Sequence, residues 1–396
     1  MKYTSLFIIL VSLYNCKPHT NKNNDQINGS VITPQNNTLV LNSIFDSCKL
    51  IQLTGISLTG INKVEWMDSL LVIKGKANES ELHLFTNEGK YLYSIIKTGR
   101  GANETINMQD FVIDPVKKHI DILCDYGRKI ITYSLPEKKI INTTEICPEI
   151  YAAENIKKLD STRYILYKTN GFTKNTEFKI NIYNKAKNKL EKGFLPINKK
   201  TSEYVSFSQF NNLYENNQQI FFYETFRDTI YQCSSEEIEP VWIFQKQEFS
   251  FPQQLLHKGY QGLREFIETC KNSRYIWGHI NVFEYRNLYL SLFNYKDKLY
   301  LNVIDKTGKK ANSYTRIHDN LVTDEQLELT TFFQIGNNQE YCFFQIEPID
   351  LLEIIENKKQ QNKYADYQKR FPRSCQFIEQ LKFDSNTVLV LLKSKT

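Results

Sequence analysis

Six polar side chains at comparable places in successive segments of this chain could bind one ligand together. Acids and amides gathered around an opening can hold the hydroxyl groups of a sugar or a divalent cation such as Ca²⁺. The alternative is that they line a water-filled channel and bind nothing specific. The six candidates are Glu65, Asp110, Asn155, Asn212, Glu284 and Gln334.

Arg100 is the most pointed single candidate for binding, because a glycine lies on each side of it, Gly99 and Gly101. Glycine permits positive φ and a close backbone approach, which would leave the guanidinium displayed on a loop. A guanidinium binds a carboxylate or sulfate group with parallel hydrogen bonds. It could equally hold neighbouring structural units together through carbonyl groups or an acid.

The chain has none of the residue spacings typical of hydrolytic or phosphate-binding sites. No nucleophile elbow, phosphate loop or His-Glu-x-x-His sequence occurs in it. The six histidines recur at no common position, and only His279 is expected to face a channel. We therefore expect no catalytic residues, metal site or cofactor, with Ca²⁺ kept as an alternative.

A repeat of short strands supplies the frame that these side chains need. Asp68, Asp114 and Asp160 are evenly spaced, since 114 − 68 and 160 − 114 both equal 46. Each aspartate follows an apolar strand and precedes a turn and a second strand, so we expect it to cap that turn. A period of roughly 40–50 residues built from short strands predicts a β-propeller with one blade per repeat.

The repeat continues less regularly, with further units near Glu215, Asn287 and Asn337, and predicts six four-stranded blades. A helical insertion is expected near 253–272, where it would overhang one end of the channel. A short helix is expected near 349–369. The alternative architecture is a two-sheet sandwich or a pair of β domains.

The last predicted strand, 387–392, ends the chain with no later strand to pair with. An N-terminal strand at 39–41 or at 50–53 would complete its blade. Closure of this kind removes the open sheet edges that invite aggregation.

The first 16 residues are typical of an export signal. Lys2 precedes an apolar run that is too short to span a bilayer, and Cys16 follows that run directly. Leu13 fits a bacterial lipoprotein signal, in which Cys16 becomes lipidated, whereas Asn15 fits it poorly. An ordinary signal peptide is the alternative. Residues 17–38 are polar and predict a flexible tether, which leaves 39–396 as a single propeller domain.

The charge balance of the chain is mild. Its 50 basic and 44 acidic residues give a net charge of +6, and they are dispersed along the sequence. This pattern argues against nucleic acid as a partner. Aromatic residues make up 13% of the chain, and we expect most of them to pack between strands.

The segment 97–101, followed by Glu104 and the strand 109–114, resembles the six-bladed β-propeller lipoproteins of Bacteroidota, which are related to NHL-type propellers. In that family a Gly-Arg-Gly stretch usually continues as Pro-Gly-Glu. Here Ala102 and Asn103 replace the Pro-Gly, and Glu104 is kept. The closing strand 385–390 is also similar to that of the family. The resemblance extends from about residue 39 to the end, and it implies the fold and a cell-envelope location without an activity.

Two classes of function follow. The first is a monomeric binding lipoprotein that presents one propeller face to a glycan, a peptide or an envelope protein. It would touch the membrane only through its lipid anchor, on the periplasmic or the surface face of the outer membrane. The second is a propeller hydrolase or lyase that uses a metal at the channel mouth. The missing His/carboxylate cluster favours the first, and a divalent ion on Glu65, Asp110 and Glu284 would favour the second.

Overall fold

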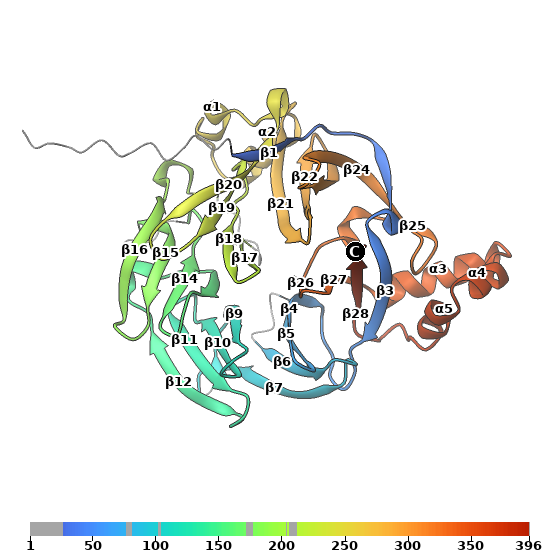
Figure 1. The fold of residues 1–396 in the computed structure, drawn as a ribbon, viewed down its shortest axis with the longest axis horizontal. Helices are drawn as coiled ribbons and strands as arrows, with labels where there is room; N and C mark the ends of the chain where they lie inside the picture. The colour runs from blue at the N-terminus through green and yellow to red at the C-terminus, as the bar shows by residue number, and fades with distance from the viewer. Residues whose placement is uncertain are drawn as a thin grey trace, which may run out of the picture.

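The computed structural model describes residues 27–76, 81–101, 104–171, 177–202, 204–205 and 212–395. The described strands fall into six sheets, which are set around a common centre like the blades of a fan (Figure 1). The prediction of an all-β propeller is therefore confirmed. The sheets are called blades 1 to 6 in the chain order of their innermost strands.

Blades 1 to 3 repeat one pattern, in which the chain runs back and forth from the innermost strand outward. Blade 1 contains β4 (Ile61–Met67), β5 (Leu70–Gly75), β6 (Leu82–Thr86), β7 (Tyr91–Thr98) and β8 (Glu104–Thr105). Blade 2 contains β9 (Met108–Asp114), β10 (His119–Cys124), β11 (Lys129–Ser134) and β12 (Lys139–Glu145). Blade 3 contains β13 (Asn155–Lys158), β14 (Arg163–Tyr167), β15 (Phe178–Asn184) and β16 (Lys189–Pro196).

Blades 4 to 6 follow the same pattern, but each also takes a strand from the N-terminal part of the chain. Blade 4 contains β17 (Leu213–Asn216), β18 (Gln219–Phe222), β19 (Thr229–Cys233), β20 (Ile238–Gln245) and β1 (Asn28–Val31). Blade 5 contains β21 (Ile276–Tyr285), β22 (Leu288–Tyr295), β23 (Lys298–Asp305), β24 (Lys310–Asp319), β2 (Asn37–Val40) and β25 (Glu325–Leu327). Blade 6 contains β26 (Gly336–Asn337), β27 (Tyr341–Ile346), β28 (Val388–Ser394) and β3 (Phe45–Gln52).

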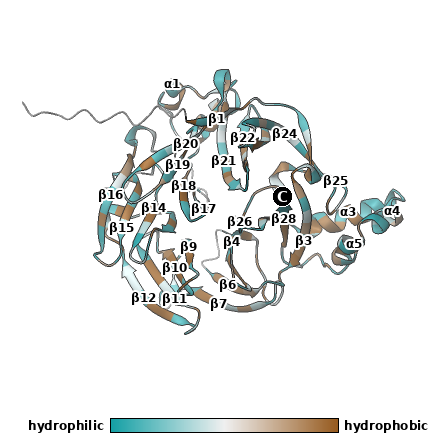
Figure 2. Cartoon of the chain, viewed as in Figure 1, coloured by the Kyte–Doolittle hydropathy of each residue, from teal (hydrophilic) through white to brown (hydrophobic). Residues whose placement is uncertain are grey.

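The hydrophobic core lies between the blades. Middle strands are covered on both faces, so β10 is buried at every position except its first, whereas no residue of the outer strand β12 is fully buried. Between blades 1 and 2, for example, Val72 and Leu84 pack with Phe111 and Ile122. Figure 2 shows hydrophobic residues along the strands of the blades. This burial explains why the middle strands form nearly continuous apolar runs in the sequence.

Two of the three evenly spaced aspartates cap turns as predicted. The carboxylate of Asp114 accepts the backbone N–H of Lys117 at 3.0 Å. That of Asp160 accepts the N–H of Thr162 at 2.8 Å. Asp68 instead adopts the left-handed conformation itself, with φ of 52°. The same turn of the repeat is therefore made in two ways.

Strand β3 closes the ring. It pairs antiparallel with β28, from Gln52 opposite Val388 to Phe45 opposite Ser394, and becomes the outer strand of blade 6. Of the two N-terminal candidates, 50–53 is confirmed as part of this pairing. Residues 39 and 40 belong to β2 on blade 5 instead.

The predicted flexible tether over 17–38 is wrong for its later part. β1 runs parallel to β20, with Asn28 opposite Trp242, and β2 runs parallel to β24, with Leu39 opposite Ile317. The outer strand of a blade presents unpaired N–H and C=O groups, and an extended segment can satisfy them whatever its side chains are. A polar composition therefore did not keep this segment from forming strands. Cys16 and the rest of 1–26 lie outside the described residues.

The predicted insertion contains α1 (Gln253–Leu256) and α2 (Leu263–Lys271). Figure 1 places both helices at the edge of the ring beside β20 and β21, so the expectation that they overhang the channel is wrong. Aromatic packing holds the insertion there, because Phe266 of α2 is fully buried against Tyr204 and Tyr260, with ring centroids 5.2 and 5.1 Å away.

The C-terminal helical segment is longer than predicted and consists of three helices outside the ring, beside β3 (Figure 1). They are α3 (Pro348–Gln360), α4 (Tyr364–Arg370) and α5 (Pro372–Glu379). Pro372 separates the last two, since proline is favoured in a first helical turn and cannot continue the helix before it. Within the described residues, no helix is long and apolar enough to cross a membrane.

Ring closure depends on Phe45, which is fully buried and lies about equally far from the rings of Tyr285, Phe332 and Phe344, at 6.3 to 6.5 Å. We expect Phe45→Ala to lower the free energy of unfolding by about 3–5 kcal/mol, because removing the ring leaves a cavity at the contact between blades 5 and 6. Urea unfolding of the purified chain measures this. The matched control is Phe383→Ala, whose ring is 74% exposed. Equal effects of the two substitutions would contradict the role given to Phe45.

Candidate functional site

A cavity of about 570 Å³ opens at the end of the central channel where the first strands finish. Residues of five blades line it, and amides are prominent among them. Two turns supply most of these amides: the turn from β17 to β18 and the turn from β26 to β27. The lining amides are Asn216, Asn217, Gln218, Gln334, Asn337, Asn338 and Gln339.

The turn from β17 to β18 holds two of these amides in an uncommon backbone conformation. Asn217 and Gln218 have φ of 49° and 63°, so both are left-handed, as in a two-residue hairpin turn of type I′. Asparagine tolerates this conformation, but glutamine rarely adopts it. Their side chains have no hydrogen-bond partner among the described residues and project at the cavity.

In the turn from β26 to β27, one amide side chain holds the turn together and two others are left to face the cavity. Asn338 Oδ1 accepts the backbone N–H groups of Glu340 at 2.8 Å and Tyr341 at 2.7 Å, which fixes the turn. Neighbouring Asn337 and Gln339 make no side-chain hydrogen bond within the part of the chain described. They are therefore available to a ligand, whereas Asn338 is occupied.

Two aromatic side chains complete the lining of the cavity. The indole N–H of Trp66 donates to the carbonyl of Asp68 at 2.7 Å, so the ring is fixed in orientation. Tyr214 is stacked on Phe221, with centroids 5.3 Å apart, and only 7% of Tyr214 is exposed. Its hydroxyl has no hydrogen-bond partner among the described residues. Tyr214 belongs to the hydrophobic core between blades 4 and 5, where Tyr289 and Glu284 are ionisable neighbours of its hydroxyl.

Charged side chains from three blades form a network at the base of the cavity. Lys63 Nζ lies 2.8 Å from both Asp110 and Glu65, and Lys157 lies 3.5 Å from Glu65. Asp110 also accepts the backbone N–H of Ile156 at 3.0 Å, which ties blade 2 to blade 3. Burial opposes the charge on Lys63, but Asp110 and Glu65 outweigh it and raise the pKa of Lys63. The network is internally balanced, so it adds little net charge to the cavity.

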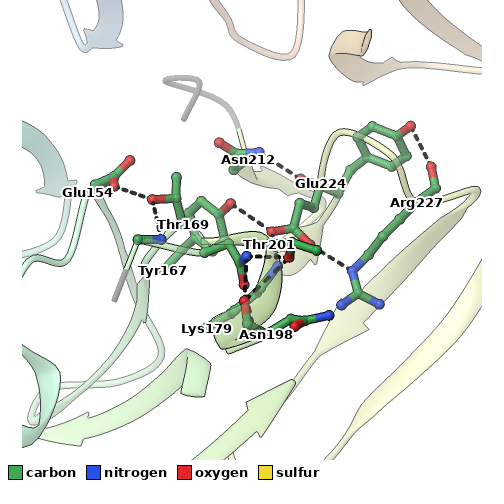
Figure 3. Close-up of polar contacts among 12 residues, drawn as sticks. Glu154, Tyr167, Thr169, Lys179, Asn198, Thr201, Asn212, Glu224 and Arg227 are labelled. Carbon is green, nitrogen blue, oxygen red and sulfur yellow. Dashed lines mark hydrogen bonds and ion pairs between the residues drawn. The ribbon is translucent and has the colours of Figure 1, made fainter. Parts of the chain in front are cut away.

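The six polar residues expected to form one ring do not do so. Glu65 and Gln334 line the cavity, and Asp110 lies behind it in the ion pair with Lys63. Asn155 is buried, with 2% exposed. Asn212 precedes β17, at the opposite end of that strand from the turn that lines the cavity, and donates to the carbonyl of Tyr223 at 2.9 Å (Figure 3). Glu284 pairs with Lys306 of its own blade. The three acids of this set, Glu65, Asp110 and Glu284, thus form ion pairs with lysines. The spacing of the acids in the sequence does not show that these lysines lie beside them.

Arg100 lies on the connection from blade 1 to blade 2, away from the cavity. It is exposed and has no partner among the described residues. Neither flanking glycine has positive φ, whereas the close approach that glycine permits and the exposure of Arg100 are confirmed. The glycines serve packing instead: a Cβ on Gly99 would lie 1.9 Å from the carboxylate of Glu104, which also accepts the N–H of Gly101 at 2.8 Å.

No group of three or more His, Cys, Asp or Glu side chains is placed to hold a metal ion within the described residues. His279 does not reach the channel cavity, because it is fully buried between blades 4 and 5. The sequence did not lead us to predict the amides of the two turns that line the cavity without a hydrogen-bond partner among the described residues, which are Asn217, Gln218, Asn337 and Gln339. Their signal was the clustering of Asn and Gln at 216–219 and 337–339, where first strands meet second strands.

The fold and the cavity define a β-propeller with a polar, ligand-sized opening at its channel mouth. The chain belongs to the family described as Domain of unknown function (DUF4934), whose model matches residues 25–393. No curated protein matches the chain.

Two solved structures with a similar fold come from Bacteroides. A protein of Bacteroides fragilis that is described as exported is 16% identical, with a TM-score of 0.73, over 93% of this chain and 100% of that one. A member of the DUF4221 family from Bacteroides vulgatus is 9% identical, with a TM-score of 0.50, over 89% of this chain and 97% of that one. The predicted relationship to propellers of Bacteroidota is thus confirmed at the level of fold.

The buried pair of Lys63 and Asp110 should be essential to stability. We expect Asp110→Ala to lower the free energy of unfolding by about 3–5 kcal/mol, because Lys63 stays buried with one partner fewer. The control is Glu236→Ala, whose carboxylate is 78% exposed and 3.7 Å from Lys192, and which should change stability by less than about 0.5 kcal/mol. Chemical denaturation of both variants measures this. A loss at Asp110 no larger than at Glu236 would refute the assignment.

Glu65 should make stability depend on pH. Burial raises the pKa of Glu65, but Lys63 and Lys157 outweigh burial and hold it below the usual 4.5. A carboxyl with a lowered pKa stabilises the fold above its unfolded pKa, and that contribution disappears as the pH falls through the folded pKa. The stability advantage of the natural chain over Glu65→Gln should therefore be full near neutral pH and shrink below about pH 4.5. Urea unfolding across pH tests this, and an advantage that grows in acid would contradict it.

Proposed function

We propose that this protein is an exported lipoprotein, anchored through Cys16, whose channel mouth binds an uncharged oligosaccharide. The observation that carries the proposal is the lining of the channel-mouth cavity. Amides supply paired donors and acceptors that match sugar hydroxyls, and aromatic rings pack on the apolar faces of sugars. Trp66 lies among amides in a cavity of about 570 Å³.

The charge arrangement favours an uncharged ligand over an anion. Lys63 and Lys157 are engaged with Glu65 and Asp110, and the remaining charged residue of the lining is the exposed acid Glu215, so the cavity offers no free positive charge to an anion. An anionic ligand would lose hydration without gaining a partner, which is unfavourable in a partly enclosed site. Acidic peptides are therefore less suited to this cavity than neutral glycans.

Export and anchoring are supported by the sequence of residues 1–16, with its basic start, apolar run and cysteine. The description of the Bacteroides fragilis relative as exported agrees with this location. An NHL-like, six-bladed lipoprotein with its propeller facing the periplasm or the cell surface accounts for both. We expect it to act as a monomer.

Calorimetric titration of the mature chain with neutral oligosaccharides tests the binding function. The variant Asn217→Gly/Gln218→Gly removes two amides that line the cavity and keeps the left-handed turn, because glycine accepts positive φ. It should weaken binding about tenfold or more. Lys138→Gly is the matched control, since Lys138 also has positive φ, 51°, and lies on an exposed turn between outer strands.

Two results would overturn the proposal. One is that no neutral oligosaccharide binds, and the other is that binding is unchanged in the double glycine variant. Binding that requires Ca²⁺ and is followed by cleavage of the sugar would replace it with the metal-dependent hydrolase or lyase.

A further inference from the structure

A second cavity, of about 290 Å³, lies between blades 4 and 5 and shares no residue with the channel mouth. The segment after β18, the end of β20, the start of the insertion and the start of β21 form its walls. It is thus built where the helical insertion meets two blades. Its principal residues are Arg227, Asp228, Lys246, Phe251, Trp277 and His279.

Arg227 is held in position from behind by a buried carboxylate (Figure 3). Glu224, 7% exposed, accepts Arg227 Nε at 2.8 Å through one oxygen. Its other oxygen accepts Lys179 Nζ at 2.6 Å and the hydroxyl of Tyr167 at 3.3 Å. In Figure 3 the two terminal nitrogens of Arg227 point away from Glu224. A guanidinium fixed through Nε, and by a further side-chain hydrogen bond with Tyr231, keeps other N–H donors for a carboxylate.

A second ion pair, of Lys246 with Asp228, also lines the cavity. Lys246, only 3% exposed, lies 2.6 Å from Asp228, whose side chain is 36% exposed. The hydroxyl of Ser250 also donates to Asp228, at 3.1 Å. In this pair the acid is the accessible member, whereas in the pair of Glu224 and Arg227 the base is. The cavity therefore shows one positive edge, at Arg227, and one negative edge, at Asp228.

His279 contributes a buried polar atom that the protein leaves unsatisfied. The imidazole is fully buried, and Nε2 lies 2.7 Å from the hydroxyl of Ser291. Nδ1 has no hydrogen-bond partner among the described residues. Burial, followed by the charge of Lys246, holds the pKa of His279 well below its ordinary value, so the ring is neutral. His279 therefore lines the cavity as a neutral group and adds no charge to it.

The remaining wall is aromatic. Phe251 and Trp277 line the cavity, and α2 supports this side through Phe266, 6.2 Å from Phe251. This packing explains the location of the insertion at the rim. It provides an apolar surface next to the two charged edges.

We propose that this cavity binds a free α-amino acid with an apolar side chain. The carboxylate would bind Arg227, the ammonium group would bind Asp228, and the side chain would pack on Phe251 and Trp277. A zwitterion satisfies both edges and adds no net charge, which avoids the cost of burying an unpaired ion. The volume suits a molecule of that size, below the usual range for larger ligands. This site is separate from the oligosaccharide site and does not depend on it.

Titration of the mature chain with phenylalanine and leucine tests the proposal. Phenylalanine should bind at least about tenfold more tightly than 3-phenylpropanoate, which lacks the ammonium group, or phenethylamine, which lacks the carboxylate. These probes use the natural chain, so they do not depend on the folding of a variant. Equal binding of all three, or no binding of either amino acid at about 10 mM, would overturn the proposal.

Two variants test which residue binds the carboxylate of the ligand and which binds its ammonium group. Arg227→Gln should weaken phenylalanine binding about tenfold or more, with Arg264→Gln as control, because Arg264 is 94% exposed on α2. Asp228→Asn should remove the preference for phenylalanine over 3-phenylpropanoate. A preference that survives Asp228→Asn would overturn the placement of the ammonium group. Oligosaccharide binding should be unchanged in both variants, which separates the two sites.

Discussion

The pairing of β3 with β28 is the constraint on which the rest of the molecule depends. Each blade is covered on both faces only when the ring is complete, because the apolar residues of the middle strands pack between neighbouring blades. Both cavities are assembled between blades and do not exist within a single one. The seven aligned pairs from Gln52 to Phe45 therefore hold the sites together although they lie far from either.

The two cavities deal with buried charge in different ways. At the channel mouth, Lys63 is surrounded by acids, and the network is complete without a ligand. Between blades 4 and 5, each ion pair turns one member toward the cavity, so a ligand with two charges can extend the network. At the channel mouth the complete network stabilises the base of the cavity beneath the amides. Between blades 4 and 5 the two separated charges would select a ligand that carries one charge of each sign.

The sequence predicted the blades well because strand period and turn chemistry are local properties. The 46-residue spacing and the apolar middle strands were enough to locate the strands of blades 1 to 3. It predicted the site poorly because channel-facing acids such as Asp110 are engaged by lysines from another strand, and nothing in their own spacing shows this. β1 was missed, and the strand expected at 39–41 was assigned to the wrong blade, for a similar reason: β1 and β2 form through backbone pairing, and their side chains do not show which strand they pair with.

The N-terminal segment has a mechanical consequence. β1 and β2 lie parallel to the outer strands of blades 4 and 5 before β3 reaches blade 6 (Figure 1). A pull applied to the chain ahead of β1 would meet β1 first and load the four aligned pairs between β1 and β20 lengthwise, so their hydrogen bonds would share the force. The force would reach β3 only after the pairings of β1 and β2 had broken. In the proposed lipid-anchored protein, β1 and β2 would therefore protect the ring from forces that come through the anchor.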